Sequence, residues 1–231
     1  MKIMSFNTQH CLNFIERRID FDVMAKAIAD CGADIVGLNE MRDGTEPPEF
    51  DAQCRILSEK CGLENFYFAK ALTLKHGDYG NGLLSRYKIV SAETIHVPDP
   101  DPRGYDGYYE HRVLLKAKLE NGLTVMVIHF GLNPDEAENA VRTVVENLES
   151  EKCILMGDFN VTPDNHVLDP IRERMSDASR LFDCEKLSFP SDKPSCKIDY
   201  IFASPDIEIV SADIPAIVAS DHRPHTAQIN F

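Results

Sequence analysis

The chain has 231 residues, of which 43% are hydrophobic and 27% are charged, and its formal net charge is −14. The length predicts a single domain over residues 1–231, and the composition excludes a disordered, fibrous or disulfide-scaffold protein. The acidic balance argues against an extended groove for polyphosphate chains, because such a groove needs lysine and arginine to displace counterions. Nucleic acid is therefore an unfavoured partner, although a local basic patch is not excluded.

The first residues, the short apolar stretches and the cysteines favour a cytoplasmic protein. Polar residues interrupt any apolar signal segment at the start, and the longest apolar stretch, 123–130, is far below the ~20 residues of a membrane-spanning helix. The seven cysteines include no C-x-x-C pair, which favours free thiols over zinc. We expect a cytoplasmic monomer without a membrane span.

In chain order, the apolar pattern of the first half predicts many strands and two helices. A strand at 2–6 precedes a helix at 21–31, which Gly32 ends as a C-cap, and the run 34–38 is typical of a buried strand. A helix is expected at 52–61, followed by strands at 66–69, 82–85, 89–96, 112–119 and 123–130. Asn121–Gly122 favours a two-residue type I′ turn between the last two strands.

The second half continues the alternation. The pattern predicts helices at 134–148 and 165–175, and strands at 153–156, 198–202, 208–211 and 226–230. About ten strands with helices between groups of them suggest two packed sheets with helices outside. The loop 98–110, with three prolines and with Tyr105, Tyr108 and Tyr109, suits either a substrate lid or an ordered surface loop.

Five clusters of polar residues follow or lie on buried apolar runs. Each residue taken alone has a structural explanation, such as a turn, a helix cap or a surface charge. Their recurrence at strand ends indicates one shared site. The clusters are Ser5-Phe6-Asn7, Leu38-Asn39-Glu40, Gly157-Asp158-Phe159-Asn160, Ile198-Asp199-Tyr200 and Ser220-Asp221-His222.

In order and spacing these motifs resemble the endonuclease/exonuclease/phosphatase superfamily of metal-dependent phosphoesterases. The most specific parts are Gly-Asp-Phe-Asn at 157–160 and Ser-Asp-His at 220–222, and the stretches 80–86 and 110–112 resemble its small bacterial hydrolases. The chain departs from the common pattern at Asn39, where glutamine is usual, and at His111, where proline is usual. The resemblance implies an α/β fold, a four-layer α/β/β/α sandwich of two mixed sheets with helices outside.

The resemblance also implies a metal site. Glu40, Asp221 and the amide oxygen of Asn7 would be its ligands. Such hard oxygen ligands suit Mg²⁺, with Mn²⁺ as a substitute. Magnesium is therefore the expected cofactor.

The same resemblance implies a set of catalytic groups. Asp158 would orient the attacking water and His222 would be held by Asp199, and either Asp158 or that pair could take the proton of the water. The set is completed by Asn160 beside Asp158 and by His129 as a donor to a phosphate oxygen. Asn81 and Arg112 are candidates for substrate or scaffold contacts, and Tyr105 is a candidate for substrate binding.

The residues are compatible with three candidate functions. The first is magnesium-dependent hydrolysis of a small or lipid-derived phosphomonoester or phosphodiester. The second is a nuclease of the same superfamily, for which the short basic strip of Lys70, Lys75, His76, Arg86 and Lys88 is the only support. The third, an inactive binding module, is unfavoured because the implied metal and catalytic residues are all present.

Overall fold

The computed structural model describes residues 1–44 and 51–231. Its strands are β1 (Lys2–Asn7), β2 (Ile35–Asp43), β3 (Asn65–Leu74), β4 (Gly77–Ser85), β5 (Ile89–His96), β6 (Val113–Leu119), β7 (Thr124–His129), β8 (Cys153–Asp158), β9 (Ser176–Asp177), β10 (Asp199–Ala203), β11 (Glu208–Asp213) and β12 (His225–Asn230). The α-helices are α1 (Phe21–Cys31), α2 (Gln53–Cys61), α3 (Pro134–Asn147) and α4 (Asp169–Arg172).

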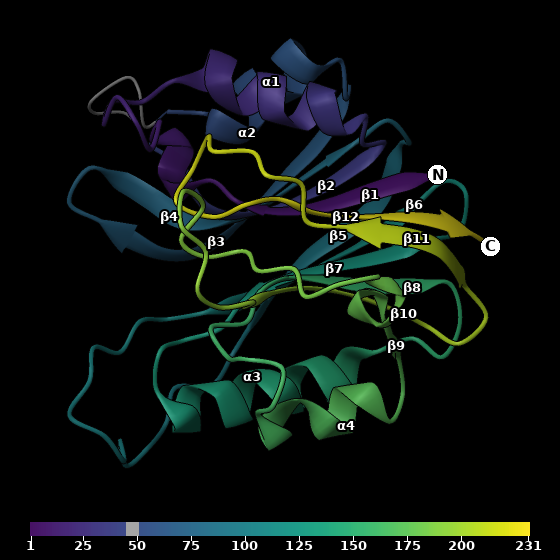
Figure 1. The fold of residues 1–231 in the computed structure, drawn as a ribbon. Helices are drawn as coiled ribbons and strands as arrows, with labels where there is room; N and C mark the ends of the chain where they lie inside the picture. Colours follow the sequence, from purple (N-terminus) through teal and green to yellow (C-terminus); the bar gives the residue numbers. More distant parts are fainter. Residues whose placement is uncertain (45–50) are drawn as a thin grey trace.

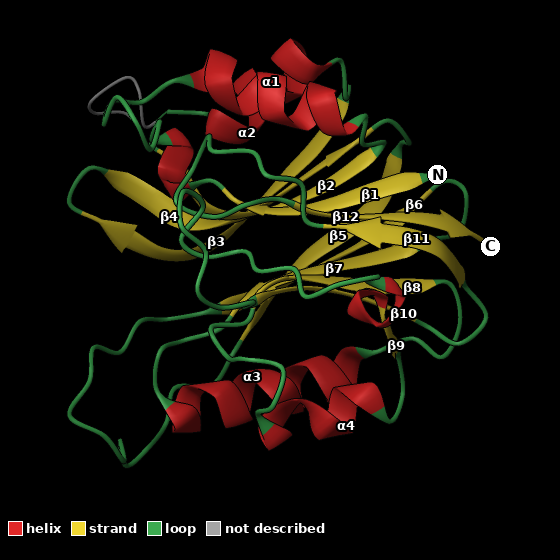
Figure 2. Ribbon diagram, in the orientation of Figure 1, coloured by secondary structure: helices red, strands yellow, loops and turns green. Residues whose placement is uncertain are grey.

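Within these residues the strands form two six-stranded sheets that pack face to face (Figure 1). The first sheet has the order β11-β12-β1-β2-β4-β3 and the second the order β5-β6-β7-β8-β10-β9. Both are mixed, because β1 pairs with β2 and β7 with β8 in parallel while the other pairs are antiparallel. Helices α1 and α2 cover the outer face of the first sheet, and α3 and α4 that of the second (Figure 2). The four-layer α/β/β/α sandwich is confirmed.

The central strands are buried on both faces. In β1, Ile3 packs into the core between the sheets, whereas its neighbour Met4 packs under α1. In β8, Ile154 and Leu155 divide in the same way between the other sheet and α3. Because both faces exclude water, these strands are continuous apolar runs in the sequence and do not alternate with polar residues.

Local capping explains where the two long helices begin and where α1 ends. The Asp20 side chain accepts from two backbone N–H groups at the start of α1, and Gly32 ends that helix in the left-handed conformation with a φ of 62°. Asn133 and Glu136 form a capping box at the start of α3, with Pro134 in its first turn. The expected helix at 21–31 is confirmed.

Two local predictions are wrong. The expected helix at 165–175 is a short 3₁₀ turn at His166–Leu168 followed by the four-residue α4. Pro170 explains this, since a proline inside a continuous helix would clash with the carbonyl of the preceding turn, whereas it fits at the start of α4. The β6–β7 connection is also not a type I′ turn. Leu119 pairs with Leu123 around a three-residue loop, in which Gly122 takes a φ of 88°.

None of the seven cysteines forms a disulfide. Along the described parts of the chain, none of the helices has the length and hydropathy needed to cross a membrane.

Candidate active site

The polar clusters of both sheets meet where the central strands end. β1 ends at Asn7, in register with Asn39 of β2, and β8 ends at Asp158, opposite His129 of β7 and Asp199 of β10. The two sheets meet at these strand ends, where Nδ2 of Asn7 donates to Oδ2 of Asp158 at 3.0 Å. One site is therefore built from both sheets.

A break in the β2 ladder turns Glu40 toward this site. The pairing with β4 shifts register between Leu38 and Met41, and Glu40 takes a left-handed φ of 61°. Such a bulge re-aims a side chain, and the conformation costs a non-glycine residue about 1 kcal/mol or more. As a result Oε1 of Glu40 accepts from Nδ2 of Asn7 at 3.0 Å. Backbone strain at Glu40 is thus coupled to the placement of a buried carboxylate.

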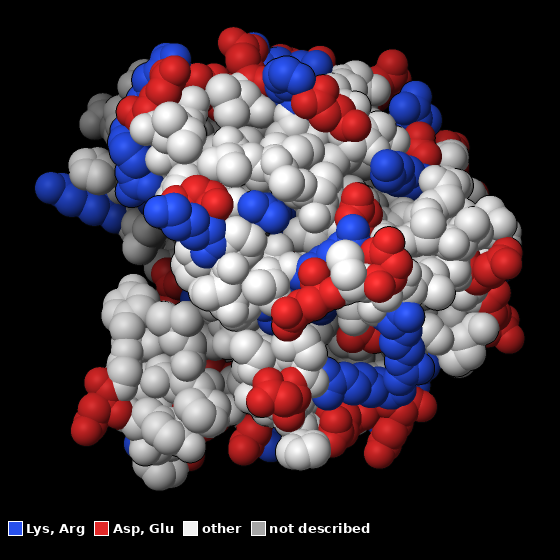
Figure 3. Space-filling model, viewed as in Figure 1, with Lys and Arg blue, Asp and Glu red and all other residues white. Residues whose placement is uncertain are grey.

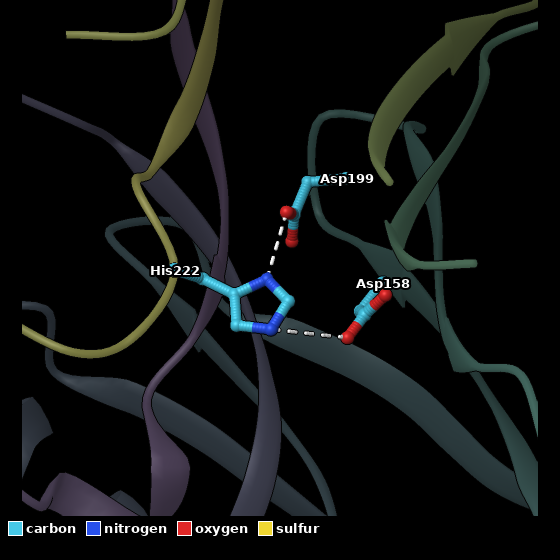
Figure 4. A group of neighbouring side chains, drawn as sticks. All are labelled: Asp158, Asp199 and His222. Atoms are coloured by element: carbon cyan, nitrogen blue, oxygen red, sulfur yellow. Dashed lines mark hydrogen bonds and ion pairs between the residues drawn. The ribbon is translucent and has the colours of Figure 1, made fainter. Parts of the chain in front are cut away.

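His222 lies between two carboxylates, which Figure 4 shows in isolation. Its Nδ1 is 2.9 Å from Oδ2 of Asp199, and its Nε2 is 3.5 Å from Oδ2 of Asp158. Asp199 is fully buried, and the other two side chains are almost so. Burial lowers the pKa of His222, but the charges of Asp199 and Asp158 outweigh this and raise that pKa to about 10. The imidazole is therefore held as a cation between the two acids.

Asp158 and Glu40 are harder to ionise than ordinary carboxylic acids. Burial raises the pKa of Asp158 to about 6, and the charge of Asp199 adds to the rise, while His222 opposes it. Burial likewise raises the pKa of Glu40 to about 7, with Asp221 and Asp158 adding to the rise. Acids perturbed by burial and by one another are typical of functional sites.

Arg112 determines the tautomer of His129. Both ring nitrogens of His129 face donors, since Nη1 of Arg112 is 3.1 Å from Nδ1 and Nδ2 of Asn160 is 3.1 Å from Nε2. A neutral imidazole accepts at one nitrogen only, and the charged guanidinium is the stronger donor. Nδ1 therefore accepts and Nε2 carries the proton, 3.5 Å from Oδ2 of Asp158. Burial and then Arg112 lower the pKa of His129 well below 6.5, so that this side chain is neutral.

Glu110 keeps Arg112 in place, because its carboxylate pairs with Nη2 at 3.0 Å. His111, the departure from the common motif, turns outward and pairs with Asp99 at 2.7 Å. The substitution at that position therefore leaves the Glu110–Arg112 pair intact.

Two buried amides join the sheets beside the site. Asn39 of β2 accepts from the backbone N–H of Asp158 at 2.9 Å and donates to the carbonyl of Ile128 at 3.0 Å. Asn39 also donates to Oδ1 of Asn81, whose own Nδ2 donates to the carbonyl of Val113. Both side chains are committed to the protein, which favours the scaffold alternative for Asn81 and explains why an amide serves at position 39.

The donor chemistry of the site fits a hard divalent cation. Glu40, Asp158 and Asp221 are close enough for the two aspartates to raise the pKa of Glu40, and a bound cation would offset that repulsion. Asn7, however, directs its N–H groups at the carboxylates while its Oδ1 accepts from the backbone of Gln9 at 3.0 Å. Ligation by Asn7 therefore requires its amide to turn over, whereas Glu40 presents an oxygen directly.

Among the described residues, Asp158, Asp199 and His222 also form a group whose ligand atoms all lie within 4.8 Å of one another. This group overlaps the implied catalytic set rather than the implied metal ligands Glu40 and Asp221.

Among the residues that the structure describes, no contact joins Tyr105 to the cluster. Tyr105 is half exposed, and the loop that carries it is held at the start of α3, where Asp135 accepts from the N–H of Gly104 and from Tyr109. The docked loop agrees with the surface-loop alternative. In the other direction, the sequence interpretation missed His10, whose Nδ1 is 3.8 Å from Oε2 of Glu40. Its position three residues after Asn7 was the available signal.

A buried lysine behind the site gives a stability prediction. Lys197 is 4% exposed and its Nζ lies 3.3 Å above the ring of Tyr200. Burial lowers the pKa of Lys197 to about 8. Between that value and the ordinary 10.5 the unfolded chain binds more protons, so the contribution of Lys197 to the free energy of unfolding rises with pH across this window. In urea unfolding series from pH ~7.5 to ~10.5, Lys197→Met should flatten this rise and Lys193→Met, at an exposed site, should not. An unchanged slope in Lys197→Met would contradict the prediction.

Comparisons with known proteins identify the family. The sequence pattern of the Endonuclease/Exonuclease/phosphatase family matches residues 4–222. The chain therefore belongs to this family, and it is a hydrolytic phosphoesterase. Members generally use a divalent metal ion.

Solved structures share the fold at low sequence identity. A family protein from Bacteroides vulgatus has a TM-score of 0.76 and 21% identity, covering 100% of this chain and 98% of its own. The mannosyl-6-phosphatase Bt3783 of Bacteroides thetaiotaomicron has a TM-score of 0.79 and 18% identity, with 100% of both chains covered. ANGEL2, a 2′,3′-cyclic phosphatase, has a TM-score of 0.74 and 15% identity, covering 99% and 94%. A search of curated proteins found no match.

Proposed function

We propose that this protein hydrolyses small phosphate monoesters or diesters with a bound divalent metal ion, Mg²⁺ or Mn²⁺. The observation that carries the proposal is the convergence of three nitrogen groups, from Asn7, His129 and His222, on one carboxylate oxygen of Asp158. A buried anion surrounded by donors and next to further acids is the arrangement needed to activate water beside a bound phosphate.

Asp158 is the proposed acceptor for the proton of the attacking water. Each ring nitrogen of His222 already faces a carboxylate oxygen, so that the imidazole offers no lone pair for this purpose. As the water oxygen bonds to phosphorus, one of its protons passes to Asp158, and the bond from phosphorus to the ester oxygen breaks. Asp199 positions His222, whose charge stabilises the phosphate.

His129 is the proposed donor to a non-bridging phosphate oxygen. Its Nε2–H faces the site, and the guanidinium of Arg112 beside Nδ1 disfavours the tautomer that carries the proton on Nδ1. Arg112 is thereby a positioning residue. Glu40 and Asp221 would hold the metal ion, with Asn7 after its amide turns. When bound, that ion supplies Lewis-acid stabilisation of the charge on the leaving oxygen.

The distribution of charge supports a small substrate over nucleic acid. On the face shown in Figure 3, basic and acidic side chains are interspersed rather than gathered into one basic tract. Within the strip that would support a nuclease, Lys70 pairs with Asp78 at 3.0 Å and Arg86 with Asp34 at 2.8 Å. Charges that are neutralised within the protein contribute little to the release of phosphate counterions.

A panel assay tests this function. Activated phosphomonoesters, phosphodiesters, a 2′,3′-cyclic nucleotide and duplex DNA are incubated with Mg²⁺ or Mn²⁺ and with chelator. We expect metal-dependent hydrolysis of a small ester, at a rate that changes little with added NaCl, and no duplex binding at ~0.15 M salt. Steeply salt-dependent DNA binding coupled to strand cleavage would replace this proposal with a nuclease. Hydrolysis that survives exhaustive chelation would overturn the metal dependence.

A further inference from the structure

A cavity of about 850 Å³ opens beside the candidate active site, between α3 and the loops that follow β7 and β8. These loops connect the second sheet to the helical layer of α3 and α4 (Figure 1). The volume lies in the range of ~300–1,000 Å³ that is usual for sites that bind small molecules. Its apolar lining includes Pro134, Ala137, Val141, Val145, Val161 and Val167.

Asn160 connects this cavity to the reacting centre. It lines the cavity, its backbone N–H donates to Oδ1 of Asp158 at 2.9 Å, and its amide nitrogen is 3.1 Å from Nε2 of His129. Gly131, which follows two residues after His129, lines the cavity as well. A phosphate held by His129 would therefore have its organic group at the mouth of this cavity.

The most buried aliphatic side chains of the lining belong to α3. Ala137 and Val141 are 2% and 5% exposed, whereas the exposed lining residues at the rim include Leu132 and the polar Glu138, Arg142, Thr162, Asn165 and His166. A sugar against this buried part would leave the hydroxyl groups that face Ala137 and Val141 without partners, which costs binding free energy. An alkyl or aryl group would instead gain from leaving water.

We infer that the cavity binds the organic group of the substrate, and that this group is an alkyl or aryl group rather than a sugar. The inference rests on the proposed phosphoesterase function for its role in turnover. Its binding part can be measured without turnover, and the two parts can therefore fail separately.

The test compares alkylphosphonates, which carry the anionic head group but no ester bond to cleave. Calorimetry in buffer with Mg²⁺ gives Kd for methylphosphonate, hexylphosphonate and mannose 6-phosphate. Each buried methylene contributes roughly a threefold to fourfold gain. We therefore expect hexylphosphonate to bind at least about tenfold more tightly than methylphosphonate, and also more tightly than mannose 6-phosphate.

Two variants assign that preference to the cavity. Leu132→Glu places a charge at the exposed rim, where folding is not at risk, and Val141→Trp fills the floor. Both should reduce the preference for hexylphosphonate over methylphosphonate to below about threefold, because each opposes burial of the hexyl group. Val210→Glu, at a half-exposed apolar position on β11, is the matched control and should keep it. If Val141→Trp does not fold, Leu132→Glu decides alone.

Equal affinity for the two phosphonates, tighter binding of mannose 6-phosphate, or an undiminished preference in Leu132→Glu would overturn the inference. If the preference is found but no ester in the panel is hydrolysed, the proposed function fails and the binding site stands. If methyl and hexyl esters are hydrolysed with the same kcat/KM, the function stands and the role of the cavity in turnover fails.

Discussion

Asp158→Asn should lower kcat by ~10²-fold or more while the fold is retained, the usual loss when an acid–base group is removed. The amide keeps the shape of the side chain but cannot take up a proton. Asparagine also replaces an acceptor by a donor at one position, next to the N–H groups of Asn7 and His222. Steady-state kinetics on the ester found in the panel measures the loss, and circular dichroism checks the fold.

Asp177→Asn is the matched control for that experiment. Asp177 is also buried, but the hydrogen bonds that its carboxylate accepts come from Ser179, which is not part of the catalytic cluster. Its replacement should lower the melting temperature and leave kcat near the wild-type value. Near-normal turnover in Asp158→Asn, or an equal loss in both variants, would contradict the role of Asp158.

Glu40→Gln should weaken metal binding at least ~10-fold and, in the metal-free protein, raise the melting temperature. The buried carboxylate is costly to ionise, as its raised pKa indicates, and a neutral amide removes that cost. Glutamine can still accept from Asn7, so the local fold is kept. Thermal unfolding with and without Mn²⁺ measures both effects, because a ligand that binds only the folded state raises its stability.

The substitution should raise the melting temperature of the metal-free protein and reduce the rise that Mn²⁺ causes, so the two measured effects have opposite signs. Mn²⁺ should raise the melting temperature of the wild-type protein and have much less effect on Glu40→Gln. Glu16→Gln, which removes an exposed carboxylate in an ion pair with Arg18, is the control and should keep the full response. An unchanged metal response in Glu40→Gln would remove Glu40 from the metal site.

The sequence is informative about strand ends but not about how side chains turn there. Apolar runs predict the central strands because burial on both faces leaves few polar residues in them. Parallel pairing places Asn7 beside Asn39 in one sheet and His129 beside Asp158 in the other. The bulge at Glu40 depends instead on pairing with β4, which lies about 40 residues further along the chain. Likewise, the hydrogen bond between Arg112 and His129 joins β7 to the residue before β6, and no local pattern indicates it.

The remaining errors have local causes that compete with one another. Pro170 is compatible with a helix start and with a helix break, and only packing decides between them. Asn-Gly fits a two-residue or a three-residue hairpin loop, and the register of β6 on β7 selects the second. Strand β9 has two residues, too few to produce a periodic signal. The roles of the site residues, the single domain and the cytoplasmic location stay predictions.

The hydrogen bonds by which Asn39 and Asn81 join the two sheets have a consequence for the folding of this enzyme. Since Asn7 and Glu40 come from one sheet and His129, Asp158 and Asp199 from the other, the distance between the sheets is also the distance between the two halves of the active site. Either sheet could acquire its own hydrogen-bonded ladder before the halves are in reach. Catalytic competence would then emerge only when the sheets dock, and activity regained during refolding would report that docking rather than the formation of secondary structure.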